Sequence, residues 1–171
     1  MTGCRRSEVS AATWSEIDLA TRTWTIPASR HKAGSEHHIP LTDDTVALLA
    51  GLPRHRSGDH VFTTTFGKTS IAGFSKFTAR LVRAMRSELG PDMPPFCLHD
   101  LRRTFRSRLS EIGISERVAE LCIAHAPRNA LVRIYDQHRF ADEIRAAHEA
   151  WHRRLRDILE PPHSNIVPLR A

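Results

Sequence analysis

The stretch CLHDLRRTF, from Cys97 to Phe105, places a histidine and an arginine one helical turn apart. His99 and Arg102 stand at i and i+3 in a segment that we expect to be helical from Leu98 to Ile112. Residues at this spacing share one face of a helix, so both side chains can reach a single oxyanion. The pair alone is weak evidence of a site, because a surface histidine and arginine often occur at this spacing.

Upstream of this stretch, the sequence predicts an antiparallel hairpin from Arg22 to Leu41. The segment RTWTIP alternates polar and apolar residues as a half-buried strand does, and HHIPL follows as a second short strand. The residues SRHKAGSE between them have turn chemistry, which puts Lys32 in the connecting loop. We therefore expect Lys32 to be held outward.

The rest of the chain is predicted to be mainly helical. Thr42 is expected to begin a helix that Gly51 and Pro53 end, and apolar residues recur at helical spacing from Phe74 to Leu89. Further helices are expected in SEVSAATW after Arg6 and over residues 115–124, about 128–136, and 141–159. The predicted fold class is α+β, mainly α-helical, with a small antiparallel sheet near the N-terminal end.

The composition indicates one domain with a polyanionic partner. The chain has 171 residues, is 40% hydrophobic, and has no apolar run of membrane length and no apolar N-terminal signal segment. Its net charge of +6 suits nucleic acid first and a membrane surface second. The three cysteines, Cys4, Cys97 and Cys122, are odd in number and widely spread. We therefore expect them to be small buried side chains of a protein in a reducing compartment, without disulfides.

Ordered motifs extend the observation at His99 and Arg102 over nearly the whole chain. TGCRRSE opens the sequence, RHKAGSEHHIPL follows at the hairpin, HDLRRTF comes next, and IAHAPRNALVRIYDQH places Tyr135 ten positions after His125. Together they resemble the catalytic domain of the tyrosine recombinases, the phage integrase family, and most of all the integrases of prophages and genomic islands. The resemblance implies a site-specific DNA recombinase that integrates or excises a mobile element.

The resemblance also assigns catalytic residues. The family's L-G-H motif appears here as Ile123-Ala124-His125, which keeps the histidine but makes the backbone bend less free. The implied catalytic set is Arg5, Lys32, His99, Arg102, His125 and the nucleophile Tyr135. Further DNA contacts are predicted from the basic residues Arg30, Lys76, Arg80, Arg83, Arg103 and Arg128.

The residue types suit phosphodiester chemistry independently of the family name. Two guanidiniums, those of Arg5 and Arg102, can clamp the charge that builds on the nonbridging oxygens. A tyrosine hydroxyl has a pKa of about 10 and needs positive potential and a proton acceptor, for which His99 is the candidate. His125 would donate to the phosphate, and Lys32 would protonate the departing 5′ oxygen. The product is a 3′-phosphotyrosyl link, and neither metal nor other cofactor is implied.

Each residue also has a simpler explanation. Tyr135 could pack in the core, Lys32 could solubilise the hairpin, and Arg5 could form a structural bridge with Glu8, which could also orient it. His125 alone is more often a satisfied histidine than a catalyst. The basic stripe on the Phe74–Leu89 helix could be a solvated face.

A zinc-dependent hydrolase is the alternative from another functional class. The sequence HEAWH, from His148 to His152, matches H-E-x-x-H, but no third ligand follows at a familiar spacing. An apolar stripe with Trp151 explains this helix by packing. Cys97-Leu98-His99 and Cys122-Ile123-Ala124-His125 offer a second set of ligands whose spacing is unusual. The sequence is also compatible with a DNA-binding remnant without activity, or with an enzyme like the type IB topoisomerases.

The resemblance finally sets expectations for domains and partners. Family members usually carry a helical portion before T-G-C-R and, before that, a core-binding domain. We therefore expect residues 1–159 to be a catalytic domain without these parts and residues 160–171 to be an extended or disordered tail. The expected partners are double-stranded DNA and other protomers, as a tetramer on DNA and without a membrane. The expected location is the bacterial cytoplasm, at the nucleoid when DNA is bound, and the 141–159 helix is expected to dock in cis or in trans.

Overall fold

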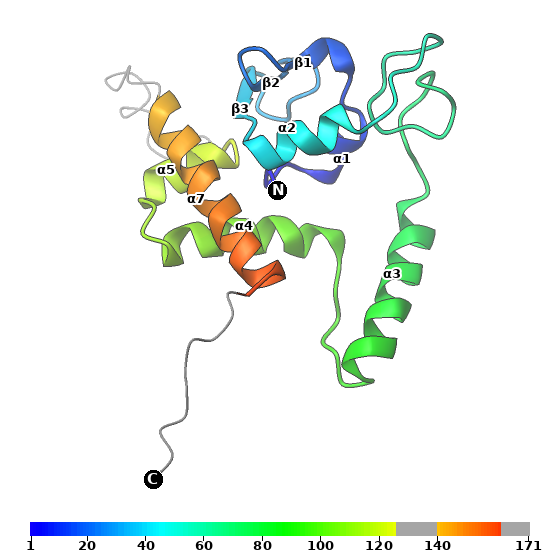
Figure 1. The fold of residues 1–171 in the computed structure, drawn as a ribbon, viewed down its shortest axis with the longest axis vertical. Helices are drawn as coiled ribbons and strands as arrows, with labels where there is room; N and C mark the ends of the chain where they lie inside the picture. Colours follow the sequence, from blue (N-terminus) through cyan, green and yellow to red (C-terminus); the bar gives the residue numbers. More distant parts are fainter. Residues whose placement is uncertain (126–139, 162–171) are drawn as a thin grey trace.

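The computed structural model describes residues 1–125 and 140–161, which form a small sheet and a set of helices (Figure 1). The elements in chain order are α1 (Arg6–Ser10), a 3-10 turn (Trp14–Glu16), β1 (Ile17–Asp18), β2 (Thr23–Ile26), β3 (His37–Pro40), α2 (Asp43–Ala50), α3 (Phe74–Leu89), α4 (Leu98–Glu111), α5 (Glu116–Cys122) and α7 (Ala141–Leu159). The predicted fold class is confirmed.

The sheet is antiparallel in the order β1-β2-β3. Trp24 pairs with both Ile17 and Ile39, and β2 alternates half-buried and buried residues because successive side chains of a strand point to opposite faces. The predicted hairpin is therefore confirmed. The two-residue strand β1 was not predicted, since it is too short to show a period.

The sheet and its neighbours share one apolar core. Its buried members come from the segment after α1, from β2 and β3, from α2 and from the loop after α2. They are Ala12, Trp14, Trp24, Ile26, Ile39, Leu41, Leu49 and Val61. This core holds the hairpin against α1, so the loop that carries Lys32 starts from a rigid base.

A second core joins α4, α5 and α7. Phe105 and Leu109 of α4 pack with Val118 and Ala119 of α5 and with Trp151 of α7. In Figure 1, α7 crosses both α4 and α5. The ring of Trp151 meets that of Phe105 edge-on, with the centroids 5.7 Å apart. Helix α7 thus docks in cis on the described chain.

The histidines of HEAWH face the interior. His148 is 1% exposed and lies against the Phe105 ring. His152 is 2% exposed, and its Nδ1 lies 2.8 Å from Oγ1 of Thr42 and 3.4 Å from Oδ2 of Asp44. The packing explanation of this helix is confirmed: His152 connects α7 to the start of α2, and His148 packs against α4.

Helix α3 stands apart from the two cores, at the right of Figure 1. It begins at Phe74 and ends at Leu89 as predicted, but it has no buried residue. Phe77 is 50% exposed and Leu89 is 69% exposed. The amphipathic pattern correctly predicted the helix, while the apolar stripe has no deep packing within the described chain.

Some expectations were wrong or lie outside the described residues. Helix α1 ends at Ser10, before the predicted limit, and is followed by the 3-10 turn. Cys97 is exposed rather than buried, because it is the N-cap of α4. The expected helix at 128–136 and the tail beyond residue 161 fall in segments that are not described. Among the described helices, none is long and apolar enough to cross a membrane.

Candidate active site

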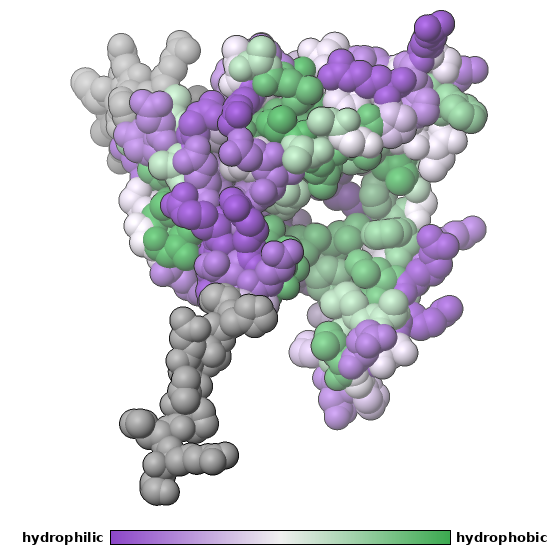
Figure 2. Space-filling model, in the orientation of Figure 1, coloured by the Kyte–Doolittle hydropathy of each residue, from purple (hydrophilic) through white to green (hydrophobic). Residues whose placement is uncertain are grey.

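A cleft of about 770 Å³ collects most of the predicted catalytic residues. Arg5 precedes α1, Lys32 lies in the hairpin loop, and His99 and Arg102 lie on α4, yet all of them line this cleft. Its far wall is α3, through Phe74, Thr78 and Val82 among others. Figure 2 shows a hollow between α3, the start of α4 and the sheet region.

Arg5 is oriented by Glu8. Arg5 Nη1 donates to Glu8 Oε1 at 2.8 Å, and the Arg5 backbone N–H donates to Oε2 at 2.7 Å. Burial raises the pKa of Glu8, but the hydrogen bonds and charge of Arg5 outweigh this and lower it below the usual value. Glu8 therefore stays ionised at neutral pH and holds the guanidinium at the cleft wall.

Arg102 is fixed by backbone carbonyls. Its Nη1 donates to the Gly3 carbonyl at 2.7 Å and its Nη2 to the Ile123 carbonyl at 2.6 Å, and the residue is 7% exposed. Burial, and then the charge of Arg5, lower its pKa. An arginine nevertheless stays charged. These bonds tie the N-terminal turn to the end of α5.

Gly3 is required at this turn. Its φ of +66° lies in the left-handed region, and a Cβ there would come within 2.3 Å of the Phe105 ring. Only glycine allows the T-G-C-R turn to approach α4 closely enough for Arg102 to bond its carbonyl.

His99 lies in the first turn of α4. Asp100 Oδ2 accepts a hydrogen bond from the backbone N–H of Cys97 at 2.8 Å, which caps the helix. This bond lowers the pKa of Asp100. The His99 ring is exposed at the cleft and has no hydrogen bond to any residue in the described ranges. It is free to contact a bound phosphodiester.

Lys32 is the exposed tip of a well-anchored loop. The neighbouring His31 is buried, and its Nδ1 donates to the Ser35 carbonyl at 2.6 Å, which closes the loop. Lys32 itself is exposed, as predicted, and within the described chain it makes no hydrogen bond or ion pair. A lysine held in this way can reach a ligand in the cleft.

His125 and Tyr135 differ from the others. His125 is the last residue of the described 1–125 segment and does not line the cleft; its Nδ1 lies 2.6 Å from Oε2 of Glu120. Ala124 before it has φ of +52°, so the bend occurs in the left-handed region, where a Cβ is unfavourable. Tyr135 and Arg128 lie outside the described residues.

The predicted DNA contacts separate into two groups. Lys76, Arg80 and Arg83 are exposed on α3, and Arg103 is exposed although it pairs with Asp100 at 2.9 Å. The guanidinium of Arg30 bonds Glu16 and the Glu8 carbonyl within the protein, so these contacts give no support to its predicted role in DNA binding. Its acidic partner Glu16 lies 14 positions away, so the sequence did not indicate this pairing.

Sequence reasoning missed Arg6. It lines the cleft, and its Cζ lies 5.0 Å from the centroid of the Phe74 ring at the start of α3. The doubled arginine of TGCRRSE was a signal that could have found it. Arg6 thus marks where α3 meets the turn that carries Arg5.

The described residues contain no group of three or more His, Cys, Asp or Glu side chains that could hold a metal ion. Cys97 is exposed and Cys122 is buried, and the two Cys/His pairs do not gather into such a group. The buried His148 and His152 are used in packing.

Comparison with solved structures identifies the fold. XerA recombinase matches with a TM-score of 0.56 and 18% identity, over 89% of this chain and 54% of that one. The Tn1549 transposon integrase, in complex with circular intermediate DNA, matches with a TM-score of 0.54 and 17% identity, over 86% and 53%. The fold is that of tyrosine recombinase catalytic domains.

Sequence comparison gives the family. The pattern of the phage integrase family matches residues 1–142. Prophage integrase IntA of Escherichia coli (strain K12) is 28% identical over 152 residues, which cover 88% of this chain and 35% of IntA. The chain belongs to the phage integrase family. It spans about a third of IntA and about half of the two solved chains.

Proposed function

We propose that this chain is the catalytic domain of a site-specific recombinase that cleaves and rejoins DNA strands through Tyr135. The observation that carries the proposal is the convergence of Arg5, Lys32, His99 and Arg102 on one cleft. The prophage integrase similar to this chain, and the transposon integrase solved with circular intermediate DNA, support it.

The two arginines would hold the scissile phosphate. Arg102 is kept in place by its carbonyl partners, and Arg5 by Glu8, so neither must reorganise when charge builds on the nonbridging oxygens. Each guanidinium retains N–H groups that these bonds do not use. Preorganised donors of this kind stabilise the transition state more than mobile ones do.

The remaining residues would move protons. His99 takes the proton of the Tyr135 hydroxyl as its oxygen attacks phosphorus, and His125 donates to the phosphate. The P–O5′ bond breaks, and Lys32 gives the departing 5′ oxygen its proton. The 3′-phosphotyrosyl link conserves the bond energy, so a 5′ hydroxyl from another strand can reverse the step. This chemistry needs no cofactor.

We also propose the extent of the domain, its partners and its location. Residues 1–159 form the catalytic domain and 160–171 its tail, and the partners are double-stranded DNA and other protomers, as a tetramer on the recombination site. The setting is the bacterial cytoplasm, at the nucleoid. The net charge of +6 and the exposed Lys76, Arg80 and Arg83 support a DNA partner.

Covalent trapping tests the proposal. A DNA half-site from the end of the mobile element, with a bridging 5′ phosphorothiolate, is incubated with wild type and Tyr135→Phe in the presence of EDTA. An adduct that survives SDS and is missing from the variant supports Tyr135 as nucleophile. Salt-sensitive DNA binding without an adduct, equal in both proteins, favours a DNA-binding remnant. Hydrolytic activity that EDTA abolishes, together with one bound zinc per protein, would favour the zinc hydrolase.

A further inference from the structure

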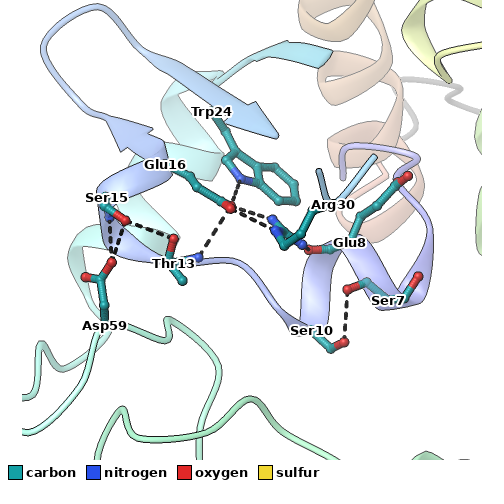
Figure 3. Close-up of polar contacts among 9 residues, drawn as sticks. All are labelled: Ser7, Glu8, Ser10, Thr13, Ser15, Glu16, Trp24, Arg30 and Asp59. Atoms are coloured by element: carbon teal, nitrogen blue, oxygen red, sulfur yellow. Dashed lines mark hydrogen bonds and ion pairs between the residues drawn. The ribbon is translucent and has the colours of Figure 1, made fainter. Parts of the chain in front are cut away.

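Arg30 uses all three guanidinium nitrogens to join two segments beside the cleft. Its Nε donates to Glu16 Oε1 at 2.8 Å and its Nη2 to Oε2 at 2.5 Å, while Nη1 donates to the Glu8 carbonyl at 3.0 Å (Figure 3). The pairing with Glu16 is bidentate, the arginine–carboxylate geometry that fixes direction as well as distance. The side chains are 24% and 11% exposed, so water competes weakly for these bonds.

Glu16 is itself fixed by the first core. Its Oε2 accepts a hydrogen bond from Trp24 Nε1 at 3.0 Å, and the Trp24 side chain is buried in the sheet core. The backbone N–H of Thr13 also points to Oε2, at 3.5 Å. Figure 3 shows Trp24, Thr13 and Arg30 converging on this one carboxylate. Glu16 is therefore held by contacts other than the one with Arg30.

The segments that Arg30 joins are those that carry Arg5 and Lys32. Lys32 follows Arg30 by two positions, and Glu8 is the residue whose carboxylate holds Arg5. The buried His31 ring lies beside Glu8, with its Nε2 4.0 Å from Oε1, which is beyond hydrogen-bond distance. The base of the Lys32 loop and the Arg5 turn thus share one polar network.

We propose that Arg30, held by Glu16, is a positioning residue that sets the place of Lys32 relative to Arg5. The inference rests on the proposed function. Arg30 does not touch the DNA; it acts through the loop that carries the proton donor. A proton donor displaced by about 1 Å loses rate by as much as about 100-fold, because transfer requires a defined geometry.

A comparison of leaving groups separates positioning from a purely structural role. The 5′ oxygen of a normal half-site needs a proton to depart, whereas the sulfur of a bridging 5′ phosphorothiolate departs as a thiolate without one. If Lys32 is displaced, cleavage of the normal half-site (the oxygen substrate) therefore slows, whereas cleavage of the phosphorothiolate half-site (the sulfur substrate) does not. A loss of folded protein slows both substrates equally.

The experiment measures single-turnover adduct formation with both half-sites for wild type, Lys32→Ala, Arg30→Gln, Glu16→Gln and Arg22→Gln. Arg22→Gln is the matched control, because it breaks an exposed arginine–carboxylate pair with Asp43 in the same part of the fold. We expect the sulfur-to-oxygen rate ratio to rise about 10-fold to 100-fold in Arg30→Gln and Glu16→Gln, as in Lys32→Ala, and to stay unchanged in Arg22→Gln.

Each outcome is decisive. An unchanged ratio in Arg30→Gln and Glu16→Gln overturns the proposal, whether or not the rates fall together. If thermal melting shows that Arg30→Gln is unfolded, Arg30→Lys, which keeps the charge but not the bidentate contact, is judged by the same ratio. Failure of the wild type to form an adduct with the sulfur substrate would instead count against the proposed function itself.

Discussion

Helices α3 and α7 have similar sequence patterns but different surroundings. Both are amphipathic, and both begin and end where the apolar periodicity predicts. Helix α7 buries Ala147, His148, Trp151 and His152, whereas α3 buries no residue. An apolar stripe therefore predicts that a helix forms and which face is apolar, but it does not predict what covers that face.

The largest effect is expected from removing the central side chain of α7. Trp151→Ala should lower the free energy of unfolding by about 3–5 kcal/mol, because the ring is 5% exposed and contacts Phe105 in the second core. Urea denaturation followed by circular dichroism measures the loss. Leu159→Ala, at a 70% exposed position of the same helix, is the control and should change little. A loss below about 1 kcal/mol for Trp151→Ala would show that α7 is not anchored this way.

Acid should weaken the α7 contact. Burial, followed by the neighbouring His152, lowers the pKa of His148 to about 3, while the unfolded chain titrates near 6.5. The unfolded state therefore binds more protons below pH 6.5, and stability falls as the pH falls, by about 2 kcal/mol from pH 7 to pH 5. His37, whose pKa is lowered to about 4 by burial and then by His31, adds a loss of the same sign.

Urea denaturation at pH 7 and at pH 5 measures how much the free energy of unfolding falls for each protein. His148→Leu keeps an apolar contact with Phe105 and should remove about 2 kcal/mol of the pH dependence. His38→Gln is the control, because the His38 side chain is 60% exposed. Equal slopes for wild type and His148→Leu would contradict the assignment.

A matched aromatic truncation on α3 should cost much less. Phe77 is 50% exposed, so Phe77→Ala should lower the free energy of unfolding by less than about 1 kcal/mol. The same urea titration measures it beside Trp151→Ala. A loss close to that of Trp151→Ala would break the comparison, because it would mean that α3 is as deeply packed as α7.

The smallest change in stability is expected on the polar face of α3. Replacing the exposed Lys76, Arg80 and Arg83 by glutamine should leave stability within about 0.5 kcal/mol. If these residues contact phosphates, the slope of log affinity against log salt should fall by about 0.9 for each phosphate that is no longer neutralised. Arg153→Gln with Arg154→Gln, on the exposed side of α7, is the matched control. A slope unchanged from wild type in the α3 variant would assign no DNA contact to α3.

Local signals predicted most of the fold. The hairpin, α3 and α7 were predicted because strand alternation and helical periodicity are properties of neighbouring residues. Strand β1 and the 3-10 turn were missed, since each is only a few residues long. The early end of α1 was missed because nothing in SEVSAATW marks Ser10 as a boundary.

The candidate site was predicted in part. Motif order indicated Arg5, Lys32, His99 and Arg102, and the structure brings these residues to one cleft. Arg30 was assigned to DNA as one of the basic residues. Its true partner, Glu16, is 14 positions away, and no local pattern links the two.

The sequence by itself determined the types of the longer elements and the ends of α3 and α7, because these depend on contacts within a few residues. The order of the polar motifs can be read directly from the chain. Only the tertiary structure decided that Arg102 bonds the carbonyls of Gly3 and Ile123, and that His152 lies against Thr42, 110 positions away. Such pairings arise when separate apolar faces pack together. A helix face does not specify which residues will cover it, so the partners of α7 and the exposure of α3 became known only in the folded chain.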